Sequence, residues 1–228
     1  MLHRPQVEQE AIERVKGRVI YVLLAMMLLQ LTYPISLYST THNVVYFSLY
    51  CGLLASGVYL ASVSRGRRIA AITLAVLTLV AGIPWQLTGG QVVWLTLLSY
   101  AMLFLFQGMI ILVLIDFIFA TDSMNRDVLY AACTIYIILG NLFTALYMII
   151  HTLDPEAFFV SGPLESPLPW QRIVYFSYST LTTLGYGDIA PVSPWAQSLA
   201  AIESMTGLLY IAIILGRLVS VYKSSSDK

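Results

Sequence analysis

Hydrophobic residues in this chain fall into long runs that are separated by short polar segments. A helix needs about 20 apolar residues to cross the hydrocarbon core of a membrane. Helices are expected there because lipid offers no hydrogen-bond partners to exposed backbone groups. Six runs are long enough: residues 19–38, 44–63, 69–87, 92–120, 128–150 and 196–221. The pattern therefore predicts an all-α membrane protein with six transmembrane helices.

The connection between the last two runs, residues 151–195, is much longer than the others and rich in proline. Within it, Trp170–Leu181 is predicted to form a short helix that starts after Pro169. Its twelve residues would span about 18 Å, roughly half of the membrane core. The chain would enter the membrane and return as non-helical backbone, which is tolerated only in a protein interior or along a polar cavity. A re-entrant helix followed by an irregular segment is expected.

Composition supports a membrane protein and excludes several other classes. The 228 residues are 58% hydrophobic and 11% charged, with 12 basic and 12 acidic side chains. A disordered chain would need low hydrophobicity, and a nucleic-acid-binding protein would need a basic face. The two cysteines do not make a disulfide framework. We therefore expect membrane lipid, and no nucleic acid, among the partners.

The basic residues indicate the orientation in the membrane. Eleven of the twelve fall on one side of a six-helix topology, and only Arg172 falls on the other. Because basic loops stay in the cytoplasm, both termini are predicted to be cytoplasmic in a multi-pass protein of the cell membrane. A cleavable signal peptide is not expected, because no small-residue cleavage site follows the first run.

The segment after the short helix has the composition of a cation site. Its sequence is Thr182-Thr183-Leu184-Gly185-Tyr186-Gly187-Asp188. Glycine accepts backbone angles that other residues avoid, and its alternation with larger residues lets successive carbonyls point to one side. Such carbonyls can replace the hydration shell of a cation, and the negative C-terminal end of the preceding helix favours the same charge.

This segment resembles the selectivity filter of the tetrameric potassium channels, from whose T-V-G-Y-G motif it differs only at Leu184. The resemblance covers about residues 169–223 and implies a pore helix, a filter and an inner helix. It implies that the Thr183 hydroxyl and four carbonyls bind K⁺ as the permeant ion, with no cofactor; the carbonyls are those of Thr183, Leu184, Gly185 and Tyr186. The implied filter residues are Thr183, Leu184, Gly185, Tyr186 and Gly187. Gly207, twelve residues after Trp195, would be the gating hinge of the inner helix, or a packing contact.

The resemblance also implies a domain organisation and an assembly. One filter per chain cannot surround an ion, so a homotetramer is expected. Residues 128–222 would form the pore domain, with the pore loop at 152–195, and residues 19–120 a peripheral four-helix domain. Residues 1–18 and 223–228 would be cytoplasmic. The run 92–120 contains no Lys or Arg, so strong voltage sensing is not expected. The sequence does not decide the gating stimulus, which could be lipid, membrane tension, pH, the pore itself or another subunit.

Three further residues are candidates for supporting the filter. Asp188 would brace the outer mouth and concentrate cations, or be a solvated loop acid. Glu203 lies inside the last run, where an acid is costly. It would brace the filter from behind by pairing with a pore-loop hydroxyl, or be protonated and structural. Thr182 would support the filter from the end of the short helix.

Two other functions remain open from the sequence. Leu184 could alter filter packing and give a cation channel of low selectivity. A non-conducting regulatory or scaffold subunit could also retain the pore sequence. An enzyme is not expected, since no nucleophile–base pair or metalloprotease motif stands at a useful spacing.

Overall fold

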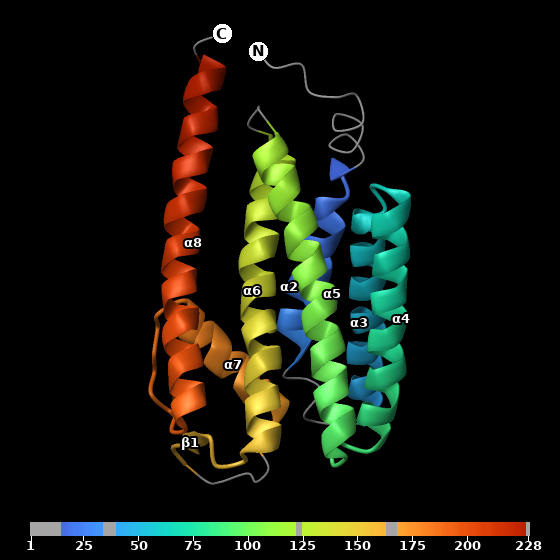
Figure 1. The fold of residues 1–228 in the computed structure, drawn as a ribbon, viewed down its shortest axis with the longest axis vertical. Helices are drawn as coiled ribbons and strands as arrows, with labels where there is room; N and C mark the ends of the chain where they lie inside the picture. Colours follow the sequence, from blue (N-terminus) through green and yellow to red (C-terminus); the bar gives the residue numbers. More distant parts are fainter. Residues whose placement is uncertain (1–14, 34–39, 122–124, 163–167, 227–228) are drawn as a thin grey trace. The chain divides into compact units, whose positions relative to one another are not determined.

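The computed structural model describes residues 15–33, 40–121, 125–162 and 168–226, which are predominantly helical (Figure 1). The helices are α2 (Val19–Thr32), α3 (Thr40–Ala61), α4 (Arg65–Leu87), α5 (Val93–Ala120), α6 (Arg126–Leu153), α7 (Trp170–Leu181) and α8 (Pro194–Ser226). Two short strands, β1 (Phe158–Val160) and β2 (Ile189–Pro191), complete the described elements. The predicted class, an all-α membrane protein, is confirmed in these general terms.

Within the described residues, four helices are long and apolar enough to cross a membrane: α4, α5, α6 and the Pro194–Arg217 part of α8. The apolar helices Val19–Thr32 and Val45–Ala61 are shorter. The first predicted run extends to residue 38, but residues 34–38 lie outside the described part, as do residues 1–14 of the predicted N-terminal segment. The chain is therefore a multi-pass membrane protein.

Helices α3, α4 and α6 begin two to four residues before the predicted runs, and α4 begins inside the segment 64–68 that was expected to connect two helices. Ser64 ends the connection by capping the new helix. Its hydroxyl oxygen accepts from the Arg67 N–H at 3.3 Å, and its carbonyl accepts from the Arg68 N–H at 2.9 Å. A serine side chain that accepts from an N–H of the first turn is a favourable N-cap. The arginines of this connection therefore lie on the first turn of a helix.

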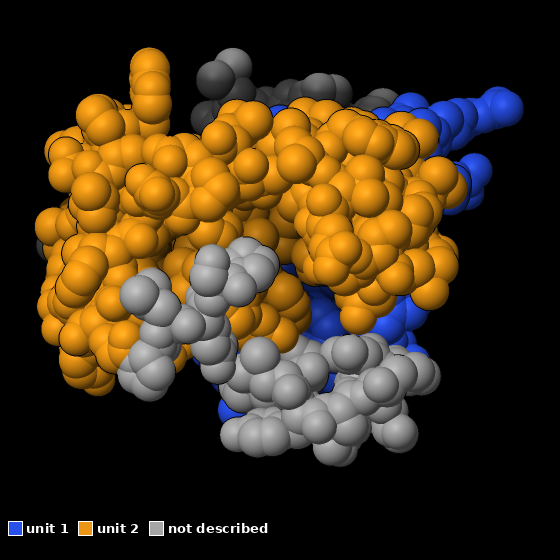
Figure 2. All heavy atoms as spheres, turned by 90° about the horizontal axis from the view of Figure 1, so that it is seen from below, with its two compact units in different colours: residues 1–76, 106–138, 217–228 blue, residues 77–105, 139–216 orange. Residues whose placement is uncertain are grey.

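The described chain divides into two compact units (Figure 2). The first combines residues 1–76, 106–138 and 217–228, and the second combines residues 77–105 and 139–216. In the first unit, the backbone at Gly57 lies so close to Phe106 that an added Cβ would stand 2.7 Å from the ring. In the same unit, the Arg67 guanidinium of α4 pairs with the Asp116 carboxylate of α5 at 2.6 Å. The close contact at Gly57 thus joins α3 to α5, and one exposed ion pair joins α4 to α5.

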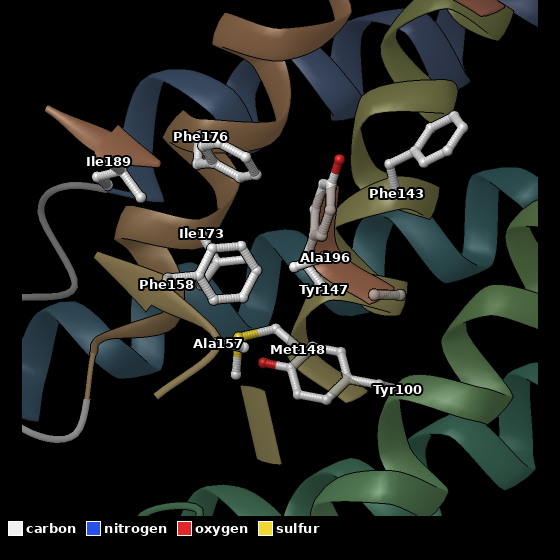
Figure 3. Close-up of a cluster of buried hydrophobic side chains, with 11 residues drawn as sticks. Tyr100, Phe143, Tyr147, Met148, Ala157, Phe158, Ile173, Phe176, Ile189 and Ala196 are labelled. Atoms are coloured by element: carbon white, nitrogen blue, oxygen red, sulfur yellow. The ribbon is translucent and has the colours of Figure 1, made fainter. Parts of the chain in front are cut away.

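The second unit contains an aromatic core between α6, α7 and the strands (Figure 3). The rings of Tyr147, Phe158 and Phe176 pack edge to face, with centroids 5.0–5.8 Å apart. Such pairs add about 0.5–1.5 kcal/mol each beyond the area that they bury. The core fixes one face of α7 against α6.

The two strands form a small antiparallel ribbon that was not predicted. Phe159 pairs with Ala190, so the ribbon joins the segment after α6 to the segment that follows Asp188. Three residues are too few to show an alternating pattern in a sequence. Further bonds extend the junction, since the N–H groups of Val192 and Ser193 donate to the Ala157 carbonyl at 2.8 and 3.2 Å. Both ends of the glycine-rich segment are therefore held, by α7 on one side and by the ribbon on the other.

Candidate functional site

The short helix α7 has the bounds predicted for it, Trp170–Leu181. Pro169 precedes it in an extended conformation, as expected for a proline that begins a helix. One face of α7 is buried and the other is partly open, since seven residues of the helix are buried: Gln171, Ile173, Val174, Phe176, Ser177, Ser179 and Leu181. The buried face positions the end of the helix, from which the glycine-rich segment departs.

The backbone of the glycine-rich segment alternates between two conformations. Thr183, Gly185 and Gly187 have φ values of +59°, +55° and +78°. Leu184 and Tyr186, which alternate with these three residues, do not have positive φ. Alternation of left-handed residues with residues of ordinary handedness is the backbone condition for carbonyls that point to one side. The conformation at the two glycines agrees with the prediction.

Thr183 is the unexpected member of this alternation, because a β-branched residue rarely adopts positive φ. The left-handed conformation costs a residue with a Cβ roughly 1–2 kcal/mol. Hydrogen bonds to α7 offset the cost: the Thr183 N–H donates to the Thr180 carbonyl at 3.0 Å. The N–H groups of Leu184 and Gly185 both donate to the Ser179 carbonyl, at 2.9 and 3.2 Å. The last turn of α7 therefore imposes the conformation of the segment.

The side chains of the glycine-rich segment are largely exposed in the single chain. The exposed fraction is 56% for Leu184 and 67% for Tyr186. The Tyr186 ring stacks on Tyr175 of α7, with centroids 6.2 Å apart and planes 11° from parallel. The Thr182 hydroxyl donates to the Tyr178 carbonyl at 2.7 Å, which ties Thr182 to the last turn of α7.

Asp188, at the far end of the segment, is tied to two other parts of its unit. Its Oδ1 accepts from the Tyr175 hydroxyl at 3.1 Å. Its backbone carbonyl accepts from the Ser161 N–H at 2.8 Å, which continues the β1–β2 ribbon. Asp188 is half-buried, so its carboxylate is held in place rather than freely solvated.

Behind α7, four residues from three helices meet at one buried position. Ser177 Oγ lies 2.6 Å from Glu203 Oε1 of α8 and 2.7 Å from the Gly140 carbonyl oxygen of α6. Glu203 Oε2 lies 2.6 Å from the Tyr147 hydroxyl of α6. The side chains of Tyr147, Ser177 and Glu203 are each 0% exposed. The expected pairing of Glu203 with a pore-loop hydroxyl is therefore present.

At Gly207 the backbone of α8 lies close to the end of α7. A Cβ added there would overlap the carbonyl oxygen of Leu181, the last residue of α7. Helix α8 continues through this position without a break. The packing contact considered for Gly207 is thus observed, and the hinge role stays a prediction.

The sequence interpretation expected a pore-loop hydroxyl beside Glu203 but did not identify it as Ser177, and it did not anticipate Tyr147. Tyr147 and Ser177 were assigned only to apolar helices, and Gly140 was given no role, although its backbone lies against Tyr178, whose ring would be 2.5 Å from an added Cβ. The available signal was a serine on the apolar face of a short helix, together with an acid in a transmembrane run. A sequence alone does not show which helices meet there. Among the described residues, no group of three or more His, Cys, Asp or Glu side chains could hold a metal ion.

Comparisons with known proteins point to the same part of the chain. Residues 157–224 match the family model described as "Ion channel". The inward rectifier potassium channel Kirbac3.1 of Paramagnetospirillum magnetotacticum is 30% identical over 95 residues, which are 40% of this chain and 31% of that protein. The uncharacterized membrane protein YdjJ of Bacillus subtilis is 31% identical over 96 residues, 42% of this chain and 28% of that protein. Two-pore potassium channel 5 of Arabidopsis thaliana is 38% identical over 47 residues, 21% of this chain and 12% of that protein.

No solved structure matches the chain. The chain spans less than a third of the length of each of these three relatives. The resemblance to potassium channels is confirmed for this part of the chain: residues 157–224 match the ion-channel family model, and two of the relatives are named as potassium channels. A transport protein, rather than an enzyme, is the class that these matches indicate.

Proposed function

We propose that the chain is the subunit of a potassium-selective channel, which conducts K⁺ passively through backbone carbonyl sites. The observation that carries this proposal is the alternating backbone at Thr183, Gly185 and Gly187 at the C-terminal end of α7. Carbonyl oxygens in such a row replace the hydration shell of K⁺, and the end of α7 adds negative potential.

The ion sites that we propose are formed by the filter carbonyls and by the Thr183 hydroxyl. These residues are Thr183, Leu184, Gly185, Tyr186 and Gly187. Asp188 shapes the outer mouth, Thr182 and Glu203 support the filter, and Gly207 lies where the inner helix would bend to gate the pore. K⁺ is the permeant ion, and no cofactor is required.

A homotetramer accounts for two exposed surfaces. Residues 182–187 are all exposed in the single chain. Helix α8 also exposes a large apolar surface, with exposed fractions of 45–60% at Ile202, Met205, Leu208, Leu209, Ile211, Ile213 and Leu215. Three further copies would enclose the filters around one axis, and α8 would line the pore or contact neighbouring chains. Lipid would cover the rest.

In the membrane, we propose six transmembrane helices with the re-entrant helix α7, both termini in the cytoplasm, and insertion in the cell membrane. Residues 19–120 would form the peripheral domain and residues 128–222 the pore domain. Helix α5 contains no Lys or Arg, so it cannot move gating charge through the membrane field in the way that an arginine-rich helix does. The channel would therefore have weak voltage dependence.

Flux from purified protein in liposomes tests the proposal. Vesicles loaded with K⁺ should release it when a protonophore balances the charge, and vesicles loaded with Na⁺ should release far less. The mass of the detergent-solubilised assembly should equal four chains. Failure to release K⁺ at any tested voltage, pH or membrane tension would instead favour a regulatory or scaffold subunit.

A weakly selective cation channel is the second candidate, and Leu184 is the residue that favours it. Its side chain replaces the usual valine and is 56% exposed, so it occupies space that neighbouring subunits would share. A Leu184→Val variant separates the two functions. If wild type and Leu184→Val prefer K⁺ over Na⁺ equally, the selective channel is supported. If only Leu184→Val prefers K⁺, the wild-type protein is the weakly selective channel.

A further inference from the structure

Three short oxygen–oxygen contacts meet behind the filter, at the position that we call the α6–α7–α8 node. The node consists of the Gly140 carbonyl, Tyr147, Ser177 and Glu203. Its contacts measure 2.7 Å between Ser177 Oγ and the Gly140 oxygen, 2.6 Å between Ser177 Oγ and Glu203 Oε1, and 2.6 Å between Tyr147 Oη and Glu203 Oε2. All three distances are typical of O–H···O hydrogen bonds, so each contact requires one hydrogen atom between its two oxygens.

The hydroxyl groups of the node supply only two hydrogens. Tyr147 and Ser177 each have one O–H, and the Gly140 carbonyl can only accept. Ser177 must donate to Gly140, because no other group supplies a hydrogen to that contact. Tyr147 donates to Glu203 Oε2. The contact between Ser177 and Glu203 Oε1 is then left without a hydrogen unless the carboxyl group carries one.

The charges around the node favour the same conclusion. Among the described residues, Glu203 contacts two hydroxyls and no basic side chain. Within the second unit, α8 carries no other charged residue, α7 carries only the exposed Arg172, and α6 contributes His151, one turn after Tyr147. A carboxylate buried without a cationic partner is strongly unfavourable, whereas a neutral acid with satisfied hydrogen bonds is not.

We propose that Glu203 is a neutral, protonated carboxylic acid that donates its hydrogen to Ser177 and thereby fixes α7 between α6 and α8. Glu203 is then a positioning residue for the filter. Ser179, two residues after Ser177, offers the carbonyl that accepts the N–H groups of Leu184 and Gly185. A change at the node therefore reaches the filter through less than one turn of helix. The effect on ion selectivity depends on the proposed channel function, but the protonation of Glu203 does not.

Infrared spectroscopy of the full-length protein in lipid tests the protonation directly. At neutral pH, the wild-type protein should show the C=O stretching band of a protonated carboxylic acid, because exposed glutamates are ionised there. Glu203→Gln should remove this band. Glu156→Gln is the matched control, since Glu156 is exposed, and should leave it unchanged. Ser177→Ala should move the band, because the acid loses its hydrogen-bond acceptor. A wild-type spectrum without the band overturns the proposal, whether or not the variants fold.

Ion flux in the same preparations tests the positioning role. Glutamine preserves a donor toward Ser177 and an acceptor for Tyr147, so K⁺ flux of Glu203→Gln should stay within about twofold of wild type. Glu203→Ala removes the hydrogen-bond partner of the buried Ser177 and Tyr147 hydroxyls. It should lower the K⁺ flux, or the preference of the channel for K⁺ over Na⁺, by about tenfold. A folded Glu203→Gln protein as impaired as Glu203→Ala would show that the negative charge is needed, which overturns the proposal. If the wild-type protein passes no K⁺, the channel function fails, while the infrared band still decides the protonation.

Discussion

Helix α7 and the segment 182–187 are adjacent in the chain, but they differ in burial and in the contacts that they make. Helix α7 buries seven of its twelve residues and pairs Ser177 with α6 and α8 of its own chain. The segment 182–187 is exposed, and most of its described bonds are backbone bonds to α7. This difference is what the proposed channel requires, in which one chain supports its own filter segment and further copies enclose it.

Gly185→Ala should have the largest effect, because it acts on the proposed filter itself. The residue has φ +55°, a conformation that costs alanine roughly 1–2 kcal/mol. No atom lies within 4 Å of the added Cβ in the single chain, so the backbone angle is the cause. Relaxation of that angle would turn a carbonyl away from the ion path, and the K⁺ preference over Na⁺ should fall by at least about tenfold. Ion selectivity in bilayer recordings measures this.

Gly66→Ala is the matched control for that change. Gly66 lies on the exposed first turn of α4, has no positive φ, and has open space around its added Cβ. The conductance and selectivity of the Gly66→Ala channel should equal those of wild type. Retained K⁺ preference in the Gly185→Ala channel would mean that the filter has been assigned to the wrong residues.

Gly207→Ala should have the next largest effect, and it acts on the support. The added Cβ would overlap the Leu181 carbonyl, and a backbone atom cannot rotate away from it. Overpacking of this kind costs typically 1–3 kcal/mol, so the midpoint of thermal unfolding in detergent should fall by several degrees. Gly216→Ala, on the same helix with open space around the added Cβ, should leave the midpoint unchanged. An unchanged midpoint with an altered open probability would favour a hinge over a packing contact.

Gly140→Ala should have a smaller effect, since the group that it meets is a side chain. Its Cβ would stand 2.5 Å from the Tyr178 ring, and the ring can shift. A shift would strain the bond from Asn141 Nδ2 to the Tyr178 hydroxyl, now 3.0 Å. We expect a loss of about 1–2 kcal/mol. The double variant Gly140→Ala/Tyr178→Ala should lose less than the sum of the two single losses. Additive losses would show that the ring and the glycine do not interact.

Asp116→Asn should have the smallest effect, because it removes an exposed ion pair of the first unit. The Arg67 and Asp116 side chains are 46% and 56% exposed, and pairs of this kind contribute about 0–1 kcal/mol. Flux should be unchanged, and the thermal midpoint should move by no more than a few degrees. A double-mutant cycle with Arg67→Gln measures the pair alone. A coupling above about 2 kcal/mol would show that this pair matters more to the fold than its exposure indicates.

The sequence was sufficient for features that depend on local pattern. Length, spacing and residue type predict the bounds of α7 and the need for glycine at positions 185 and 187. They also predict the apolar runs of α4, α5, α6 and α8. Features that depend on which helices meet were not accessible. The partners of Glu203 come from α6 and α7, and the close approach of Gly207 to Leu181 is set by the packing of α8.

Two other features escaped because their causes are weak in the sequence. The β1–β2 ribbon has strands of three residues, too short to give an alternating pattern. The positive φ of Thr183 contradicts the preference of a β-branched residue and is imposed by hydrogen bonds from the end of α7. A local conflict between propensity and observed conformation is expected at a functional site.

The most direct test of the channel function is the reversal potential of the purified wild-type protein in a planar bilayer, with K⁺ on one side and Na⁺ on the other. A row of carbonyl sites that replaces the hydration shell of K⁺ should give current with a reversal potential close to that of a K⁺-selective membrane. A reversal potential near zero with robust current would contradict K⁺ selectivity, and the absence of current under every tested voltage, pH and tension would contradict conduction itself.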